Sequence, residues 1–260
     1  ICEEFEKQVI LGLEKCNFPI EKILESNKPI GIAVSGGADS VSLLVSLCRI
    51  LKNVPIKVIT VNHFIRPIEE SCGDVNFVIN LCNSLKDQGF DVEVIVHELT
   101  VGLVKEKSTK EKIGIEASAR ELRYDCFEKS ISDFDLLFLA LAHNSNDQLE
   151  TLLMRFLQGS SVDSSAGILS SRGMYIRPLL FISRKQIESY LFENKINFCI
   201  DKTNEDNSYL RNKIRNKLVP LLNEEFCGWE HALINGAEKA YNDSVFIKKY
   251  VDELFSKISK

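Results

Sequence analysis

Apolar runs alternate with segments of helical periodicity along much of the 260-residue chain. Runs rich in Ile, Val and Leu predict buried strands at 30–34, 56–62, 92–97 and 136–142, and a fifth strand is expected near 174–179. Between these runs, apolar positions recur every three or four residues and predict helices at about 39–52, 69–87, 113–130, 146–157 and 183–193.

This order of elements indicates the fold class. Strands that are almost continuously apolar and that alternate with helices are typical of a parallel sheet covered on both faces. Because crossover connections are right-handed, we expect a doubly wound α/β fold with a mostly parallel, five-stranded sheet. Ligands bind at the carboxyl ends of the strands in such sheets. The loops at 35–40, 62–67 and 143–148 are therefore expected to surround one crevice.

The later part of the chain has a different pattern. Residues 158–173 are rich in Ser and Gly and predict a loop. From residue 204 the chain becomes helical and basic as far as Pro220, and residues 229–257 predict one long amphipathic helix. We therefore expect one domain over 1–220 and a helical appendage over 221–260.

The turn after the first strand has the composition of a phosphate-binding loop. Glycines let the backbone pass close to a ligand, and the first N–H groups of the following helix attract an anion. Asp39 offers a hard oxygen ligand for a Mg²⁺ that accompanies phosphates. The chain has no Walker A sequence, and a tight turn that merely requires glycine is the alternative. The turn consists of Ser35, Gly36, Gly37, Ala38, Asp39 and Ser40.

His143 and Asp147 follow the fourth predicted strand. A separation of four residues places both side chains on one face if this segment is already helical. An imidazole and a carboxylate there could bind metal-nucleotide phosphates, orient an amine or accept its proton. The alternative is a helix-capping cluster formed by Asn144, Asn146 and Asp147.

Basic side chains in two further segments are candidates. Arg120 follows Glu116 by four residues, so the two could form a surface ion pair. Alternatively, Arg120 faces the crevice, where its planar guanidinium suits a phosphate or a carboxylate. His63 lies in the second loop, where it or Arg66 could meet a nucleotide or substrate phosphate.

Composition and charge narrow the class of protein. Residues 155–220 carry 11 basic and 6 acidic side chains, a net charge of +5 in a chain whose net charge is −5. This segment can bind a polyanion, or it can be an ordinary solvated surface. The 8 cysteines include no C-x-x-C pair, which argues against zinc and iron–sulfur sites and favours a reducing cytoplasm. We see neither a signal peptide nor a membrane-spanning run.

Six segments resemble, in the same order, the signature segments of tRNA(Ile)-lysidine synthetases. The first of them alone would indicate only the wider pyrophosphate-loop superfamily, whereas the fourth and sixth are much more specific. The family commonly has a second His where Asn144 stands and a second acidic residue where Asn146 stands. The segments, found between residues 28 and 222, are SGGADS, VNHFIRP, EASARELRY, AHNSNDQLETLLMRFLQGS, RPLL and DKTNEDNSYLRNKIRNKLVPLL.

The resemblance implies an adenine nucleotide alpha hydrolase-like fold and a ligase reaction in two steps. ATP would adenylate O2 of the wobble cytidine in a tRNA(Ile) with a CAU anticodon, releasing pyrophosphate. The ε-amine of free lysine would then attack C2 and expel AMP, giving lysidine. Family members commonly form homodimers, and further C-terminal domains commonly follow; the amphipathic final helix could serve a homodimer or equally pack on a further domain.

The resemblance also implies roles for particular residues. Residues 35–40 and His63 would bind ATP, with Asp39 acting through Mg²⁺. Arg120 and His143 would contact the phosphates or the adenylate, and Asp147 would recognise the attacking lysine. The basic segment 211–217 would contact the tRNA backbone.

Three alternatives use the same phosphate loop. A sulfur-inserting tRNA-modifying enzyme usually needs reactive or cluster-binding cysteines, and the absence of C-x-x-C counts against it. An amidotransferase-type synthetase would need a glutaminase domain, and no segment resembles one. A non-catalytic nucleotide sensor would have no use for the pair His143 and Asp147 or for the late basic segment.

Overall fold

The computed structural model describes residues 2–65, 67–159, 166–199 and 210–258. Arg66, part of the loop expected at 158–173 and the start of the basic segment expected from 204 lie outside the described residues. Contacts divide the chain into two compact units. The sheet unit takes Ile1–Asn144 and Ser170–Ile200, and the helical unit takes Ser145–Leu169 and Asp201–Lys260.

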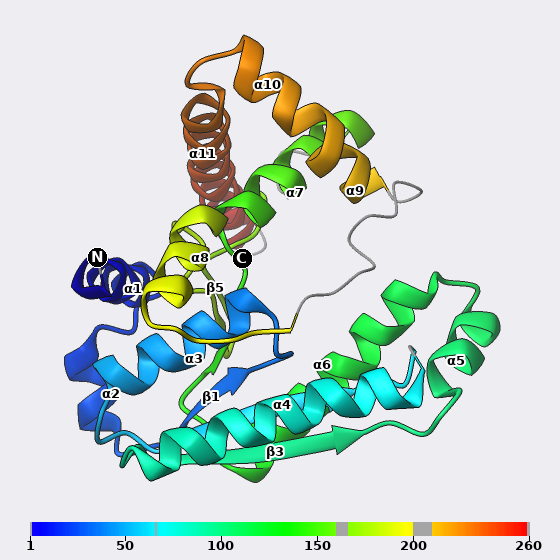
Figure 1. Cartoon of the computed structure of the whole chain (residues 1–260). Coiled ribbons are helices and arrows are strands. Elements are labelled where there is room, and N and C mark those ends of the chain that lie inside the picture. The colour runs from blue at the N-terminus through cyan, green and yellow to red at the C-terminus, as the bar shows by residue number, and fades with distance from the viewer. Residues whose placement is uncertain (1, 66, 160–165, 200–209, 259–260) are drawn as a thin grey trace. The chain divides into compact units, whose positions relative to one another are not determined.

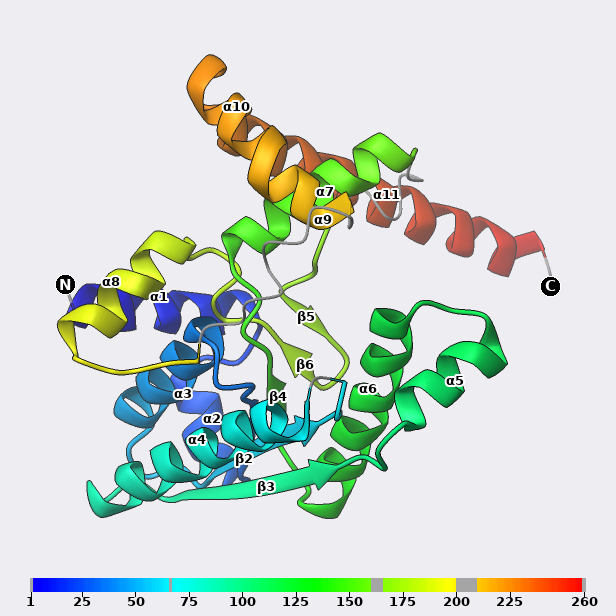
Figure 2. The same cartoon turned by 45° about the vertical axis from the view of Figure 1, so that its right-hand side comes forward.

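A six-stranded sheet forms the centre of the sheet unit (Figures 1 and 2). Neighbouring strands are parallel except for the last pair, which is antiparallel. In spatial order, the strands are β3 (Val92–Glu98), β2 (Ile56–Asn62), β1 (Ile30–Ala33), β4 (Leu139–Ala140), β6 (Tyr175–Ile176) and β5 (Ser171–Arg172).

The sequence pattern does not predict β5, so the sheet has six strands where five were expected. β5 lies in the Ser- and Gly-rich segment expected to be a loop, and its Arg172 pairs with Tyr175 of β6. The turn between them contains Gly173, whose φ of 59° is left-handed and favours glycine. A strand of two residues is too short for an alternating pattern, so composition alone suggests a loop.

Apolar side chains of the sheet pack against helices on both faces. On one face, Ile30 and Ile32 of β1 share a core cluster with helices on either side of them in the sequence. On the other face, Leu139 of β4 packs with Phe127 of α6 (Ile115–Asp133). The expected doubly wound α/β fold is confirmed. The helices of the first face are α1 (Cys2–Lys15), α2 (Ile20–Ser26), α3 (Ala38–Ile50), α4 (Ile68–Asp87) and α8 (Arg184–Glu193).

Three helices were not expected, namely α1, α2 and α5 (Leu103–Glu111). α1 and α2 precede the first strand, and α1 buries Phe5, Val9 and Leu13 in the larger core cluster. α5 packs on α6 and buries only Val104, so its sequence has a weak apolar period.

The chain order of the strands creates a switch point between β1 and β4. From β1 the chain moves outward through α3 to β2 and through α4 to β3, then returns by way of α5 and α6 to β4 on the other side of β1. The segments that follow β1 and β4 therefore leave neighbouring parallel strands in different directions. Open α/β sheets bind ligands at this position.

The helical unit contains α7 (Ser145–Gln158), α9 (Leu210–Lys213), the π-helix η3 (Ile214–Leu218), α10 (Val219–Glu225) and α11 (Trp229–Ile258). α7 contacts α9, η3 and α11. The long amphipathic helix expected at 229–257 is observed as α11. Because α7 packs on these helices, the two units divide the chain elsewhere than at the domain boundary expected at residue 220.

The π-helix has a local cause in the sequence. Leu210–Glu225 is a continuous helical run that contains Pro220, which lacks an N–H group and whose ring would clash with the carbonyl of Asn216 in an α-helix. The run widens just before the proline, where the Val219 N–H donates to the carbonyl of Ile214, five residues earlier.

No helix within the described ranges is long and apolar enough to cross a membrane.

Gly12 of α1 offers a test of the packing between α1 and the segment after β6. A Cβ at Gly12 would lie 2.0 Å from the carbonyl oxygen of Pro178, whereas a Cβ at Gly73, in α4, would meet nothing within 4 Å. We expect Gly12→Ala to lower the free energy of unfolding by about 1–3 kcal/mol. Gly73→Ala should raise it by about 0.5–1 kcal/mol, because alanine is the better helix former. Urea unfolding of both variants measures this, and equal effects would contradict the close packing at Gly12.

Candidate active site

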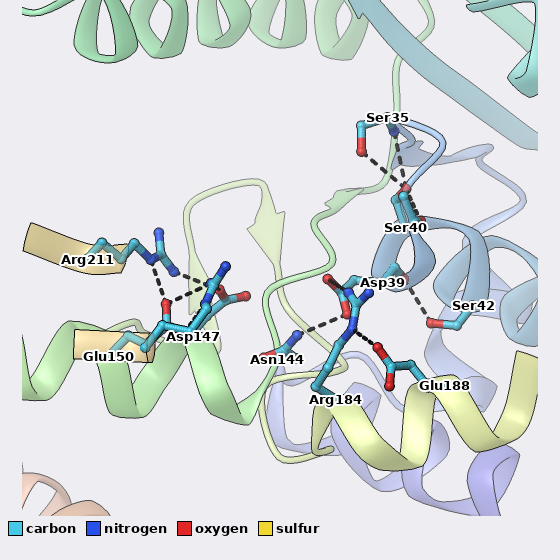
Figure 3. Close-up of polar contacts among 12 residues, drawn as sticks. Ser35, Asp39, Ser40, Ser42, Asn144, Asp147, Glu150, Arg184, Glu188 and Arg211 are labelled. Carbon is cyan, nitrogen blue, oxygen red and sulfur yellow. Dashed lines mark hydrogen bonds and ion pairs between the residues drawn. The ribbon is translucent and has the colours of Figure 1, made fainter. Parts of the chain in front are cut away.

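The loop between β1 and α3 is held by the hydroxyl of Ser40. Ser40 Oγ donates to the carbonyl oxygen of Gly37 at 2.9 Å and accepts from the N–H of Ser35 at 3.2 Å (Figure 3). Gly37 caps α3 without a side-chain hydrogen bond, and Ala38 and Asp39 form its first turn. N–H groups at such a helix start, together with the helix dipole, favour an anion. The loop expected to bind phosphate thus has a suitable backbone.

Gly36 is the position in this loop that needs glycine. Its φ of 89° is left-handed, and a Cβ there would lie 3.2 Å from Cys199 Sγ. The carbonyl oxygen of Gly36 accepts a hydrogen bond from the Cys199 N–H at 2.9 Å. At Gly37, by contrast, a Cβ would meet only Ser35 Oγ, at 3.7 Å. Glycine is therefore required at Gly36 by its conformation and by the nearby Cys199.

Side chains from two other parts of the sheet unit contact Asp39. Asp39 Oδ1 accepts a hydrogen bond from Nδ2 of Asn144 at 3.0 Å, and Oδ2 accepts one from Nη1 of Arg184 at 2.7 Å (Figure 3). Asn144 is buried and follows β4, whereas Arg184 is the first residue of α8, which Ser183 starts with a capping box. The Asp39 carboxylate therefore has a fixed position at the switch point.

Asn144 and Arg184 are site residues that the sequence interpretation missed. Asn144 was considered as a possible cap and as a departure from the family pattern, although its place directly after the strand next to β1 could have suggested contact with the loop. Arg184 has no local signal, because its contact with Asp39 joins positions 145 residues apart.

The donor set at Asp39 fits a Mg²⁺ that arrives with phosphates. Asp39 is a hard oxygen ligand whose side chain is 28% exposed. Within the described ranges, no group of three or more His, Cys, Asp or Glu side chains could hold a metal ion. Magnesium is commonly held by one or two carboxylates together with substrate phosphates, and Asp39 suits that arrangement.

His63 lies at the carboxyl end of β2 and is half-buried. Burial, followed by the nearby guanidinium of Arg123, lowers the pKa of His63 to about 4. The ring is therefore neutral near pH 7 and would meet a phosphate as a hydrogen-bonding group. Buried atoms of three neighbours in this region find no hydrogen-bond partner among the described residues, namely Asn62 Nδ2, His63 Nδ1 and Arg123 Nε.

Arg120 and Arg123 occupy different environments on α6. Arg120 is exposed, and it donates to Tyr124 Oη at 3.3 Å with its guanidinium 5.1 Å from the centre of that ring. Arg123 is less exposed, and burial lowers the pKa of its guanidinium. The cation beside His63 is thus Arg123, which the sequence interpretation named within a signature segment but did not select. The role expected for Arg120 stays a prediction.

His143 and Asp147 do not share a helical face. α7 begins at Ser145, so His143 belongs to the extended segment that leaves β4 and lies before the first helical turn. A shared helical face would require the segment to be helical already at His143, and this requirement is not met. His143 belongs to the sheet unit and is half-buried, whereas Asp147 belongs to the helical unit.

Asp147 and Glu150 form a cluster with two arginines in the helical unit. Arg211 donates to Asp147 Oδ1 at 2.6 Å and to Glu150 Oε2 at 2.7 Å (Figure 3). Arg215 donates to both oxygens of Glu150, at 2.6 and 2.9 Å. The Glu150 side chain is only 3% exposed, so its charge depends on these partners. The spacing of three residues on α7 was a signal for Glu150 that the sequence interpretation did not use.

This cluster changes the interpretation of the basic segment. Arg211 and Arg215 were expected to contact a tRNA backbone, and in the structure both are engaged with carboxylates of α7. Lys213 and Lys217 are the other cations of the segment. The role of the segment in binding tRNA stays a prediction.

The strand–loop–helix arrangement at the switch point defines the class of this protein. The PP-loop domain model matches residues 12–222, and the chain therefore belongs to the PP-loop domain family. Members of this family use ATP, which agrees with the phosphate loop found here.

Curated relatives give a more particular similarity. The chain is 40% identical over 253 residues to the tRNA(Ile)-lysidine synthase of Treponema denticola. The aligned region covers 94% of this chain and 52% of that protein. It is 40% identical over 210 residues to the tRNA(Ile)-lysidine synthase of Borreliella afzelii, and that aligned region covers 81% of this chain and 46% of that protein. The chain thus spans about half the length of the curated relatives it matches. The resemblance to this family drawn from the sequence segments is confirmed.

Solved structures with low sequence identity support the fold. The U34-tRNA thiolase NcsA of Methanococcus maripaludis matches with a TM-score of 0.71 at 16% identity, over 92% of this chain and 79% of that one. The NH3-dependent NAD synthetase of Campylobacter jejuni matches with a TM-score of 0.51 at 13% identity, over 93% of this chain and 95% of that one. Such similarity concerns the fold alone.

The geometry of the loop predicts different effects at its two glycines. Gly36→Ala should lower the free energy of unfolding by about 1–3 kcal/mol, because alanine is strained at a left-handed φ. It should also weaken ATP binding, since relaxing the strain moves the backbone N–H groups. Gly37→Ala is the matched control for stability, with an extended backbone that alanine adopts freely. Urea unfolding of both variants measures the stability, and calorimetric titration of Gly36→Ala with ATP measures the binding. Equal losses of stability in the two variants would show that the left-handed φ at Gly36 does not matter.

The lowered pKa of His63 predicts a pH dependence of stability. Unfolding returns the pKa towards about 6.5, so between about pH 6.5 and pH 4 the unfolded chain binds a proton that the folded chain does not. Stability therefore falls as the pH falls through this window. Between pH 7 and pH 5, the free energy of unfolding of His63→Gln should fall by about 1 kcal/mol less than that of the wild type. This value allows for solvent around the half-buried ring.

Denaturant unfolding at the two pH values measures this difference. His231→Gln, at an exposed position of α11, is the matched control. The same pH dependence in His63→Gln and His231→Gln would contradict the assignment.

Proposed function

We propose that the full-length protein ligates free lysine to the wobble cytidine of a tRNA(Ile) with a CAU anticodon. In the first step, O2 of the cytidine attacks the α-phosphorus of ATP and pyrophosphate leaves. In the second, the ε-amine of lysine attacks C2, the C2–O2 bond breaks and AMP leaves with that oxygen. The product is lysidine, and the enzyme is a ligase that forms a carbon–nitrogen bond.

The observation that carries this proposal is the similarity to tRNA(Ile)-lysidine synthases over most of the chain. At 40% identity over 94% of the chain, the similarity extends through the phosphate loop, the residues after β4 and the basic segment. The fold alone would not distinguish lysine ligation from other uses of ATP, because proteins of different activity share it.

The phosphate loop suits the first step. Its backbone and the start of α3 would hold the pyrophosphate part of ATP, and Asp39 would hold a Mg²⁺ that neutralises the phosphates. His63 would meet ATP as a neutral hydrogen-bonding group, and Arg120 and His143 would contact the phosphates or the adenylate. Fixed donors near developing charge are the means by which such sites lower a barrier.

The carboxylates of α7 suit the second step. Lysine arrives with a positively charged ε-ammonium, which must lose a proton before its nitrogen can attack. We assign recognition of this ammonium to Asp147, and its place next to Glu150 on α7 provides a second carboxylate for the same cation. His143 or Asp147 would accept the proton.

The remaining assignments concern partners and location. Lys213 and Lys217 would contact tRNA phosphates, since local positive charge is sufficient for backbone contacts. We further propose that the protein acts in the cytoplasm, as a homodimer, and without a membrane partner.

Lysine incorporation tests the proposal directly. The full-length protein is incubated with ATP, labelled lysine and a tRNA(Ile) transcript bearing a CAU anticodon. We expect label in the tRNA together with pyrophosphate and AMP. A transcript with uridine at the wobble position is the matched control and should stay unlabelled. No label in the CAU transcript would overturn the proposal.

Variants of the two carboxylates should separate the two steps. Asp39→Ala should abolish pyrophosphate release, because the phosphates lose their Mg²⁺ ligand. Asp147→Ala should lower the rate of lysine transfer by at least about tenfold while changing pyrophosphate release much less, since Asp147 is assigned to lysine and lies outside the phosphate loop. Glu238→Ala, at an exposed position of α11, is the control. Equal losses in both steps for Asp147→Ala would refute its assigned role.

A further inference from the structure

Arg184 neutralises the carboxylate that faces the phosphate loop. The ion pair between Arg184 Nη1 and Asp39 Oδ2 is 2.7 Å long, and its side chains are 37% and 28% exposed. Asn144 holds the other oxygen of Asp39. Without Arg184, the full negative charge of Asp39 would stand in the first turn of the helix whose N–H groups attract phosphate.

The electrostatic consequence depends on whether a metal ion is present. A carboxylate close to a triphosphate repels it, and the repulsion is stronger at a partly buried site than in water. A guanidinium or a Mg²⁺ on the carboxylate removes this repulsion. Both cations seek the same Asp39 oxygens, so binding of one weakens the hold of the other.

Arg184 is placed to change partners. Its Nε donates to Glu188 Oε1 at 2.8 Å, one turn along α8, which holds the guanidinium near the loop (Figure 3). A guanidinium presents five N–H donors in a planar fork, which suits carboxylate and phosphate alike. Because its side chain is 37% exposed, it can turn from Asp39 while Glu188 keeps its Nε.

We propose that Arg184 is a phosphate-binding residue that exchanges partners when ATP binds. In the ATP-free site it neutralises Asp39; when Asp39 takes up the Mg²⁺ that accompanies ATP, Arg184 passes to the phosphates. The proposal rests on the proposed function only through the use of ATP, and it needs neither tRNA nor lysine.

The alternative is that Arg184 merely fastens α8 to α3. This contact has a counterpart at the other end of α3, where Arg49 Nη1 donates to Asn194 Oδ1 of the α8 cap at 2.6 Å. Apolar packing also joins the two helices through Ile187 and Leu191. A fastening role predicts similar effects of Arg184→Gln and Arg49→Gln, whereas phosphate binding predicts an effect on ATP affinity for Arg184→Gln alone.

Calorimetric titration of the full-length protein with ATP distinguishes these roles. One series contains EDTA and the other contains Mg²⁺. In EDTA, Arg184→Gln should weaken ATP binding by about tenfold or more, because Asp39 then repels the phosphates without compensation. Asp39→Asn should bind metal-free ATP at least as tightly as the wild type. The double variant should recover most of the affinity lost in Arg184→Gln.

The series with Mg²⁺ should reverse which of the two variants, Asp39→Asn or Arg184→Gln, binds ATP more weakly. With Mg²⁺ present, Asp39→Asn should bind ATP more weakly than the wild type does, because it has lost the metal ligand. The affinity difference between Arg184→Gln and the wild type should be smaller than it is in EDTA. Lys185→Gln removes the same charge from the next position of α8, which is exposed, and should match the wild type in both series. Arg184→Lys should retain most of the affinity, which shows that the charge is what matters.

Several outcomes overturn the proposal. They are equal affinities of Arg184→Gln and Lys185→Gln, equal losses in Arg184→Gln and Arg49→Gln, or independent effects of Asp39→Asn and Arg184→Gln in the double variant. Absence of metal-free ATP binding by the wild type also contradicts it. A failure of lysine incorporation would leave these binding results unchanged, so the two proposals can fail separately.

Discussion

The parallel pairing of β1 with β4 is the constraint on which the site depends. It places Gly31 opposite Leu139 and Ile32 opposite Ala140, so the chain leaves both strands at the same edge of the sheet. The two leucines fill the space beside Gly31, where a Cβ would lie 2.7 Å from Leu136 Cδ1 and 2.8 Å from Leu139 Cδ1. The hydrogen bond between Asn144 and Asp39 follows from this pairing. Backbone register thus fixes polar geometry that no local sequence feature specifies.

The candidate carboxylates of each unit pair with arginines of the same unit. In the sheet unit, Arg184 pairs with Asp39, and in the helical unit Arg211 and Arg215 pair with Asp147 and Glu150. Such pairs hold a carboxylate in one geometry, yet they leave it able to accept another cation when that cation arrives with enough compensating charge. The proposed binding of Mg²⁺ at Asp39 and of an ammonium at Asp147 would each displace a counter-charge of this kind.

The sequence predicted the elements that have a strong period and missed what depends on contacts across the fold. Four apolar runs gave the strands β1 to β4, and the glycine-rich turn gave the phosphate loop. The strand β5 was missed because it has only two residues. The positions of side chains were harder to predict from the sequence than the elements. The guanidinium beside His63 belongs to Arg123, because α6 turns Arg120 to the surface. His143 lies outside the helix because α7 begins later, and Arg184 had no signal because Asp39 is distant in sequence.

The π-helix η3 lies between the helical turn that contains Arg211 and the proline of α10. A π turn takes up one more residue than an α turn, so the helical run continues through Ile214–Leu218 although it holds an extra residue there. Arg211 lies in the regular turn before it and Arg215 lies within it, and both guanidiniums donate to the Glu150 carboxylate. The widened turn therefore belongs to the geometry that brings two cations to one buried carboxylate.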